Sequence, residues 1–327
     1  PLIINIDRGD YLIKEVKFSR GGDELAYQLL HDADVMGRVR AAIDLKTHRS
    51  EAGEKALAEA ALHDSFWGVR LESVKTLSEL KTEGSRQALL EAVKDKESRI
   101  RRAAIQGLAT LKDPKLADLY IGIAKTDPSY FAIAEAARAL GQSTAPQAYD
   151  TLIALLNQDS WQDTIRGGAM RGLAALKDPR ALDIALKYAA HGNRAGVRGP
   201  AFELLGELGR GNDRALEILT AALKEQSRQI LFSAVQALGT LADPRSIPAL
   251  EEFAKRPDFP PFARQMVIMV INRIKNAAKE NQEKKKQARN VIIIPGESTA
   301  PYRRVIARYI RPGSGISPSA QPHWLRA

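Results

Sequence analysis

Residues 98–108 of the chain read SRIRRAAIQGL, and this stretch contains a helical pattern of apolar, Arg, x, x, Ala, apolar, x, x, Leu. The pattern recurs at successive steps of 30, 31, 32, 33, 32, 33 and 33 residues. Its first apolar position falls at Val39, Val69, Ile100, Ala132, Ile165, Val197, Ile230 and Ala263. A period in this range with helical content predicts a solenoid of stacked helix pairs.

Asp-Pro pairs mark the repeat junctions. They occur at Asp113-Pro114, Asp178-Pro179 and Asp243-Pro244, which lie 65 residues apart, or two repeats. Asp accepts hydrogen bonds from the first unpaired amides of a helix, and Pro at the next position has no amide hydrogen to leave unpaired. We therefore expect each pair to open the first helix of a repeat, which a turn with an acidic residue connects to the second helix.

The two ends of the chain depart from this pattern. Residues 1–18 contain two short apolar runs around Asp7-Arg8-Gly9-Asp10, which predict a β-hairpin or the end of a preceding β-sandwich. We expect the solenoid to occupy residues 19–280, with the last helix ending in the polar run of residues 275–289. Residues 281–327 are predicted to form an irregular, basic C-terminal extension.

The positive charge is concentrated in that extension. The chain carries a net charge of +10, and residues 281–327 supply +7 of it from nine Lys or Arg and two Glu. The remaining +3 leaves the solenoid nearly balanced, whereas a nucleic-acid-binding superhelix needs cations along its repeats. We therefore expect no nucleic acid as a partner. No apolar run reaches the roughly 18 residues that cross a bilayer, so no membrane contact is expected either.

The sequence offers no catalytic centre. It contains no Cys, and no two of its five His residues lie three to five positions apart, which excludes thiolate chemistry and the helical spacing of zinc ligands. No Gly-rich phosphate loop follows a strand. His31-Asp32 and His63-Asp64 occupy matching turn positions and are interpreted as structural. We predict no catalytic residue, no metal ligand and no cofactor in this chain.

The most repeated polar group is the Arg of the pattern. Because equivalent positions of neighbouring repeats stack side by side, we expect a structural ladder in which each guanidinium bridges an acidic residue of an inter-helix turn. Ile133 and Leu231 replace Arg in two repeats, which counts against an anion-binding surface. The predicted ladder consists of Arg40, Arg70, Arg101, Arg166, Arg198 and Arg264.

Large aromatic residues gather at the start of the second helices. They can seal each turn as hydrophobic staples, or they can anchor a partner at an interface. The candidate interface residues are Phe66, Trp67, Tyr130, Phe131, Trp161, Phe259 and Phe262.

The repeat units resemble the HEAT family over most of residues 20–278, as in residues 98–108 and in residues 227–239, SRQILFSAVQALG. The resemblance implies an all-α, right-handed α-solenoid of about eight helix pairs. It indicates little about function, because such arrays serve as scaffolds, adaptors and enzyme subdomains.

A narrower resemblance lies near the beginning of the chain. Residues 4–18, INIDRGDYLIKEVKF, followed by residues 25–42, LAYQLLHDADVMGRVRAA, resemble a junction in aminopeptidase-N-like zinc metallopeptidases, where a β-sandwich runs into the C-terminal helical domain. The resemblance implies an accessory domain that caps a catalytic domain and restricts substrate access. The zinc would belong to that catalytic domain, because the zinc-binding motif has no match in this chain.

Two other functions stay open. The first is a stand-alone HEAT adaptor that binds a separate protein along its concave face. The second is a subunit similar to the HEAT-like bilin lyases, which share the Leu-x-Asp-Pro style of repeat. In every case the predicted partner is a protein, either a catalytic domain of the same polypeptide or another chain.

Overall fold

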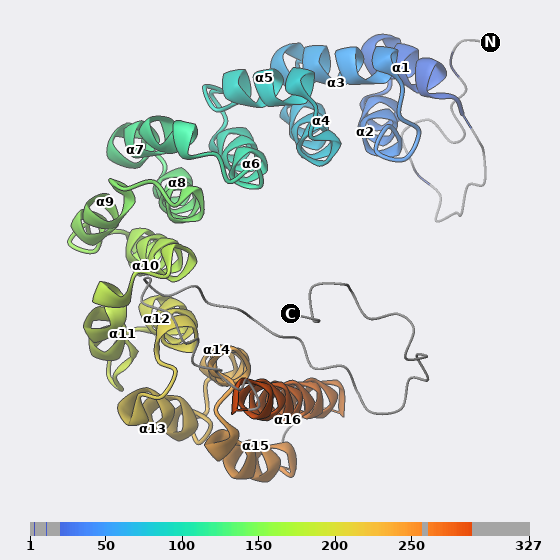
Figure 1. The fold of residues 1–327 in the computed structure, drawn as a ribbon. Helices are drawn as coiled ribbons and strands as arrows, with labels where there is room; N and C mark the ends of the chain where they lie inside the picture. The colour runs from blue at the N-terminus through green and yellow to red at the C-terminus, as the bar shows by residue number, and fades with distance from the viewer. Residues whose placement is uncertain (1–2, 4–10, 12–19, 257–260, 290–327) are drawn as a thin grey trace, which may run out of the picture. The chain divides into compact units, whose positions relative to one another are not determined.

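The computed structural model describes residues 3, 11, 20–256 and 261–289, and this part of the chain forms sixteen α-helices joined by short turns. The predicted all-α solenoid of eight helix pairs is confirmed there (Figure 1). The predicted hairpin of residues 1–18 lies outside the described residues, apart from the isolated positions 3 and 11. The part of the basic extension after residue 289 also lies outside them.

Each repeat contributes one odd-numbered and one even-numbered helix. The odd-numbered helices are α1 (Gly22–His31), α3 (Glu51–His63), α5 (Glu83–Ala92), α7 (Ala117–Thr126), α9 (Ala148–Leu155), α11 (Leu182–Ala189), α13 (Asp213–Ala222) and α15 (Ile247–Ala254). The even-numbered helices are α2 (Val35–Asp44), α4 (Trp67–Leu80), α6 (Ser98–Ala109), α8 (Tyr130–Ser143), α10 (Thr164–Leu176), α12 (Ala195–Leu208), α14 (Arg228–Leu241) and α16 (Pro261–Arg289).

The helices form two layers. Each even-numbered helix from α2 to α12 contacts the next one, which makes a continuous inner layer from α2 to α14, and the odd-numbered helices lie outside it (Figure 1). The apolar positions of each helix pair meet between the layers, where Leu57, Ile105, Leu140 and Leu205 are fully buried. The core is therefore a long strip shared by neighbouring repeats, as expected for a solenoid.

Short 3₁₀ turns open three of the outer helices. Asp113, Asp178 and Asp243 each accept a hydrogen bond from the amide two residues later, at 2.9, 3.0 and 2.9 Å respectively. The Pro after each Asp occupies the first position of a 3₁₀ turn that runs directly into α7, α11 or α15. The role predicted for the Asp-Pro pairs is confirmed.

Small residues bring α8 and α10 into close contact. A Cβ added to Gly168 would lie 2.5 Å from the Cα of Ala134, and one added to Gly172 would lie 2.5 Å from the carbonyl oxygen of Ala137. Neither position can hold a larger residue without separating the helices. The Gly residues thus permit the close approach that stacks the fourth repeat on the fifth.

The chain divides into two compact units, Pro1–Ile274 and Lys275–Ala327. The boundary falls within α16, which continues to Arg289, nine residues beyond the predicted end of the solenoid at residue 280. None of the helices in the described part of the chain is long and apolar enough to span a membrane.

Candidate protein-interaction surfaces

A row of buried arginines joins the turns between the outer and inner helices. Arg70 donates to the carboxylate of Asp95 at 2.8 Å and to the carbonyl oxygen of Asp64 at 2.9 Å. Arg101 repeats the arrangement, donating to Asp127 at 2.7 Å and to the carbonyl oxygen of Asp95 at 2.9 Å. Each guanidinium thus connects the turn of its own repeat to the turn of the next. The hydrogen bonds that Arg101 donates to the Asp127 carboxylate also raise the pKa of Arg101.

In the first repeat this position is occupied by Arg38. It donates to Asp64 at 2.8 Å and to the carbonyl oxygen of Asp32 at 2.9 Å. Arg38 lies two residues before Arg40, the residue that alignment of the repeats with one another selected for the ladder. Arg198 forms an equivalent pair with Glu225, at 2.9 and 2.7 Å.

In the other repeats the arginine binds acceptors near its own turn, or an apolar residue replaces it. Arg166 binds Asp159 and Asp163 of its own turn, at 2.5 and 2.6 Å, instead of an acid in the next repeat. Arg264 donates to the carbonyl oxygen of Arg256 at 3.3 Å. Ile133 and Leu231, which replace Arg, are buried.

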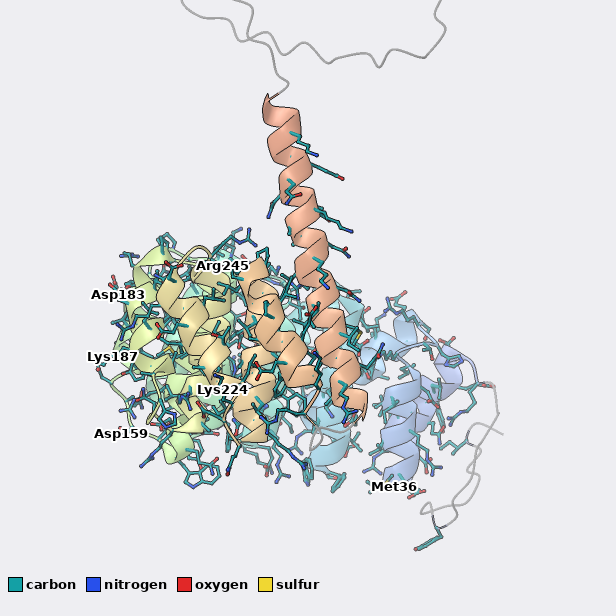
Figure 2. The ribbon with its side chains drawn as sticks, turned by 90° about the horizontal axis from the view of Figure 1, so that it is seen from below. Met36, Asp159, Asp183, Lys187, Lys224 and Arg245 are labelled. Carbon is teal, nitrogen blue, oxygen red and sulfur yellow. The ribbon has the colours of Figure 1, made fainter. Side chains whose placement is uncertain are left out.

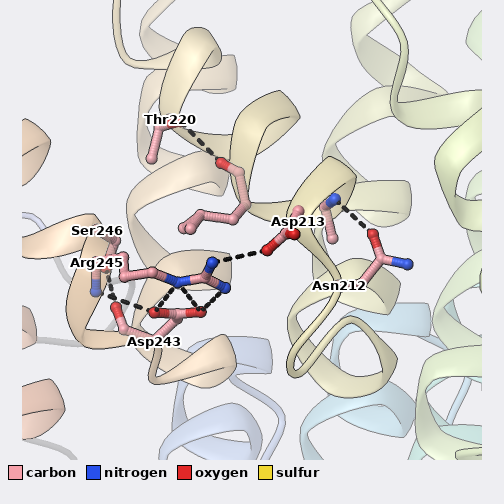
Figure 3. Close-up of polar contacts among 8 residues, drawn as sticks. Asn212, Asp213, Thr220, Asp243, Arg245 and Ser246 are labelled. Carbon is pink, nitrogen blue, oxygen red and sulfur yellow. Dashed lines mark hydrogen bonds and ion pairs between the residues drawn. The ribbon is translucent and has the colours of Figure 1, made fainter.

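A second set of contacts links the outer helices, and sequence analysis missed it. Arg245 lies between two carboxylates, 2.7 Å from Asp243 and 2.7 Å from Asp213 of the preceding repeat (Figure 3). Arg180, at the same place after Asp178-Pro179, stacks over the ring of Tyr149 at 3.7 Å. In the sequence, these contacts could have been recognised from the Arg that directly follows Asp178-Pro179 and Asp243-Pro244.

The turns that lead into the inner helices lie together at one edge of the first unit. Figure 2 shows Met36, Asp159 and Lys224 toward this edge, with Asp183 and Arg245 toward the opposite one. We call it the turn edge. It includes residues 32–36, 64–67, 94–99, 126–131, 157–163, 190–194 and 224–228.

Three of the candidate aromatic residues expose much of their side chains at the turn edge: Phe66 (38%), Phe131 (43%) and Trp161 (59%). Trp67 and Tyr130 are half-buried against the core, and each ring lies beside that of the neighbouring Phe. Phe259 lies outside the described residues, and the same holds for the side chain of Phe262.

A groove of about 300 Å³ lies on the exposed face of the inner layer. Helices α10, α12 and α14 supply its walls, with Arg171, Glu203 and Phe232 among the lining residues. Arg171 and Glu203 face each other at 3.8 Å, too far apart for a direct hydrogen bond. Desolvation raises the pKa of Glu203, but its side chain is 56% exposed, so water still reaches the carboxylate.

Sequence analysis did not single out this groove, because its residues come from three repeats. Gln229, Ser233, Gln236 and Thr240 of α14 also line it. Their spacing of four, three and four residues places them on one helical face, which was a usable signal.

The inner face carries charges of both signs. Salt bridges join neighbouring inner helices or the residues just after them: Lys46–Glu79, Arg102–Glu135, Arg171–Glu203 and Lys177–Glu207. This alternation differs from the continuous basic stripe that a phosphate backbone requires. Among the described residues, no group of three or more His, Asp or Glu side chains could hold a metal ion.

The chain belongs to the HEAT-repeat family. The family profile for HEAT repeats matches residues 22–109, 92–167 and 117–206, and the PBS lyase HEAT-like repeat matches residues 230–256. Neither profile is that of an aminopeptidase-N-like peptidase. The chain matches no curated protein.

Several solved structures resemble this array. Human deoxyhypusine hydroxylase is 18% identical, with 78% of this chain and 96% of that chain covered and a TM-score of 0.36. The CpcE–CpcF complex of phycocyanin lyase from Nostoc is 20% identical, with 82% of this chain and 98% of that chain covered and a TM-score of 0.49. The Escherichia coli protein YibA is 20% identical, with 80% of this chain and 99% of that chain covered and a TM-score of 0.47. Similarity at this level does not extend to function.

Proposed function

We propose that the chain is a non-catalytic HEAT-repeat scaffold that binds a protein partner on its inner face. The observation that supports this function is the groove over α10, α12 and α14, which combines apolar, charged and uncharged polar side chains. A segment of a partner protein offers all three kinds of group. A solenoid also presents neighbouring helices as one extended binding surface.

The groove has chemistry suited to a peptide segment. Phe232 and Pro200 supply apolar surface, and the loosely paired Glu203 accepts a further cationic donor. Gln229 provides an exposed amide that donates to a backbone carbonyl and accepts from a backbone N–H. Apolar anchors surrounded by a few placed polar groups are typical of protein-binding sites.

Selection from a random 12-residue peptide library on phage tests this function. We expect enriched peptides that bind the wild-type chain and lose at least tenfold in affinity for a Phe232→Ala, Glu203→Lys double variant. A matched control, Glu217→Lys on the exposed side of α13, should bind as the wild type does. Circular dichroism checks that all three proteins fold alike. Failure to enrich any peptide, or equal binding to the double variant, would contradict the proposal.

A finer version names the partner as the catalytic domain of an aminopeptidase-N-like zinc peptidase. It rests on the sequence resemblance alone: residues 25–42 lie in α1, α2 and the turn between them, and residues 4–18 lie outside the described residues except for position 11. The coding sequence upstream of Pro1 tests it. An in-frame helix with His-Glu-x-x-His supports this version, and an initiator Met directly before Pro1 ends it. The bilin lyase alternative has in its favour the shared Leu-x-Asp-Pro style of repeat and the single repeat that matches the PBS lyase profile.

A further inference from the structure

Three consecutive turns of the turn edge are held side by side by buried arginines. Arg70 connects the turn at Asp64 to the turn at Asp95, and Arg101 connects the turn at Asp95 to the turn at Asp127. The side chains of these arginines are 5% and 11% exposed. Residues 64–67, 94–99 and 126–131 therefore form one continuous, pre-organised surface.

This ladder also determines the charge of that surface. The carboxylates of Asp64, Asp95 and Asp127 each pair with a largely buried arginine and are themselves only 9, 10 and 6% exposed. The cations Lys96 and Arg99 on the same turns are exposed. Because the turn acids are neutralised from within, the surface that a partner meets is positive, with Glu97 as a half-buried exception.

Aromatic side chains stand on both sides of these cations. The guanidinium of Arg99 stacks over the ring of Trp67 at 4.7 Å. Arg99 and Phe131 each precede the first apolar position of their repeat pattern, Ile100 or Ala132, so they hold equivalent places on the contacting helices α6 and α8. We call Phe66, Trp67, Lys96, Arg99, Tyr130 and Phe131 the Trp67 patch.

From this arrangement we infer that the Trp67 patch docks an acidic segment of a partner protein, in which apolar side chains flank the carboxylates. Arg99 and Lys96 would pair with the carboxylates, and Phe66 and Phe131 would receive the apolar side chains. Arg and large aromatics on a rigid support are the residues that most often dominate binding energy at protein interfaces. The stack on Trp67 holds the Arg99 guanidinium in place before binding.

A nucleic acid fits this edge less well. The next two turns, residues 126–131 and 157–163, contain no Lys or Arg. At about 10 Å per stacked helix, the edge lacks turn cations over roughly 20 Å. A phosphate backbone that followed the edge would remain unneutralised over this distance.

Tryptophan fluorescence provides the test. In a full chain carrying Trp161→Phe and Trp324→Phe, Trp67 is the single tryptophan and reports on the patch. The probe is a 12-residue synthetic peptide of alternating acidic and aromatic residues, and its charge-reversed Lys counterpart is the control. We expect saturable quenching by the acidic peptide in the micromolar range and none by the Lys peptide. Raising the salt from 50 to 500 mM should weaken binding at least threefold.

Surface variants decide whether the patch is the site. The double variant Lys96→Glu, Arg99→Glu should bind the acidic peptide with at least tenfold lower affinity. The double variant Lys81→Glu, Lys112→Glu makes an equal charge change at the opposite edge and should change the affinity less than twofold. Phe66→Ala with Phe131→Ala should also weaken it, with an unchanged melting temperature. The Phe232→Ala, Glu203→Lys variant of the inner groove should bind the probe normally, so this inference can fail while the proposed function stands.

Three outcomes would overturn the inference. They are no binding of the acidic peptide at 1 mM, equal losses in the two charge-reversal variants, and tighter binding of a single-stranded 12-nucleotide DNA than of the peptide. The last result would assign the edge to nucleic acid.

Discussion

Arg101 donates from Nε and Nη2 to the two carboxylate oxygens of Asp127, each at 2.7 Å, and so joins the third repeat to the fourth. The same guanidinium donates from Nη1 to the carbonyl oxygens of Asp95 and Lys96, at 2.9 and 3.0 Å. One side chain thus satisfies acceptors in two turns. In a fold whose repeats contact only their neighbours, such links hold the register between repeats.

Removal of this guanidinium should be strongly destabilising. Arg101→Met leaves the Asp127 carboxylate, only 6% exposed, without its cation, and breaking a buried pair from one side costs about 3 kcal/mol. Arg101→Lys should be less destabilising than Arg101→Met because Lys keeps the positive charge. It should still fall short of the wild type, because Lys cannot form the bidentate contact. Urea unfolding followed by circular dichroism measures both.

The exposed Lys55–Glu51 pair on α3 is the matched control. Its side chains are 75% and 85% exposed, so Lys55→Ala should leave the urea midpoint unchanged. Equal effects of Arg101→Met and Lys55→Ala would show that the buried row adds nothing to stability.

The contact between α8 and α10 yields a second prediction. Gly168→Ala introduces a Cβ 2.5 Å from the Cα of Ala134, so the helices must move apart, and we expect a loss of about 2 kcal/mol. Gly122→Ala is the control on α7, where a Cβ meets nothing within 4 Å. It should stabilise the chain by up to about 1 kcal/mol through helix propensity. Thermal unfolding of both variants should therefore shift in opposite directions.

Sequence reasoning recovered the repeat architecture because each helix pair encodes it locally. The apolar positions and Asp-Pro junctions act within a few residues, so they could be predicted. The first repeat shows the limit. Alignment on Val39 selected Arg40, whereas counting six residues from the turn acid finds Arg38 after Asp32, just as it finds Arg70 after Asp64.

The groove and the Trp67 patch could not be predicted in the same way. Each depends on how one repeat is placed against the next, as in the stack of Arg99 on Trp67 or the approach of Arg171 to Glu203. Residue types alone also did not show that the turn acids are neutralised by buried arginines. Positive φ at Lys81, Lys112 and Thr144 had no signal either, because Gly does not mark these positions.

The Arg198–Glu225 pair predicts a dependence of stability on pH. Hydrogen bonds from Arg198 hold the pKa of Glu225 below its ordinary value of 4.5. An acid with a lowered pKa in the folded state stabilises the fold above its unfolded pKa, and this is lost as pH falls through the folded pKa. The melting temperature should therefore decrease as the pH is lowered from about 4.5.

Glu225→Gln isolates this effect from the other acids. The variant should melt below the wild type at pH 7, and the difference should shrink as the pH falls through the lowered pKa of Glu225. His191 lies 3.5 Å from Glu225, so His191→Ala is measured alongside. A difference between Glu225→Gln and wild type that stays constant down to the pH of acid unfolding would assign the loss to shape instead of charge.

The end of α14 gives a prediction in the opposite direction, a stabilising one. Ala242 adopts the left-handed conformation, with φ of 54° and ψ of 34°, and its amide donates to the carbonyl oxygen of Leu238 at 3.0 Å. This conformation costs a residue with a Cβ about 1–2 kcal/mol, while Gly loses about 0.5–1 kcal/mol more in backbone entropy on folding. Ala242→Gly should therefore stabilise the chain by up to about 1 kcal/mol.

Ala154→Gly provides the matched control, because Ala154 is exposed within α9 and its backbone is helical. The same substitution there should destabilise by up to about 1 kcal/mol. Differential scanning calorimetry of the two variants distinguishes the effects of backbone conformation from those of composition. If both substitutions lowered the melting temperature equally, α14 would not end in a left-handed residue, and the junction that places α15 against α13 would need another explanation.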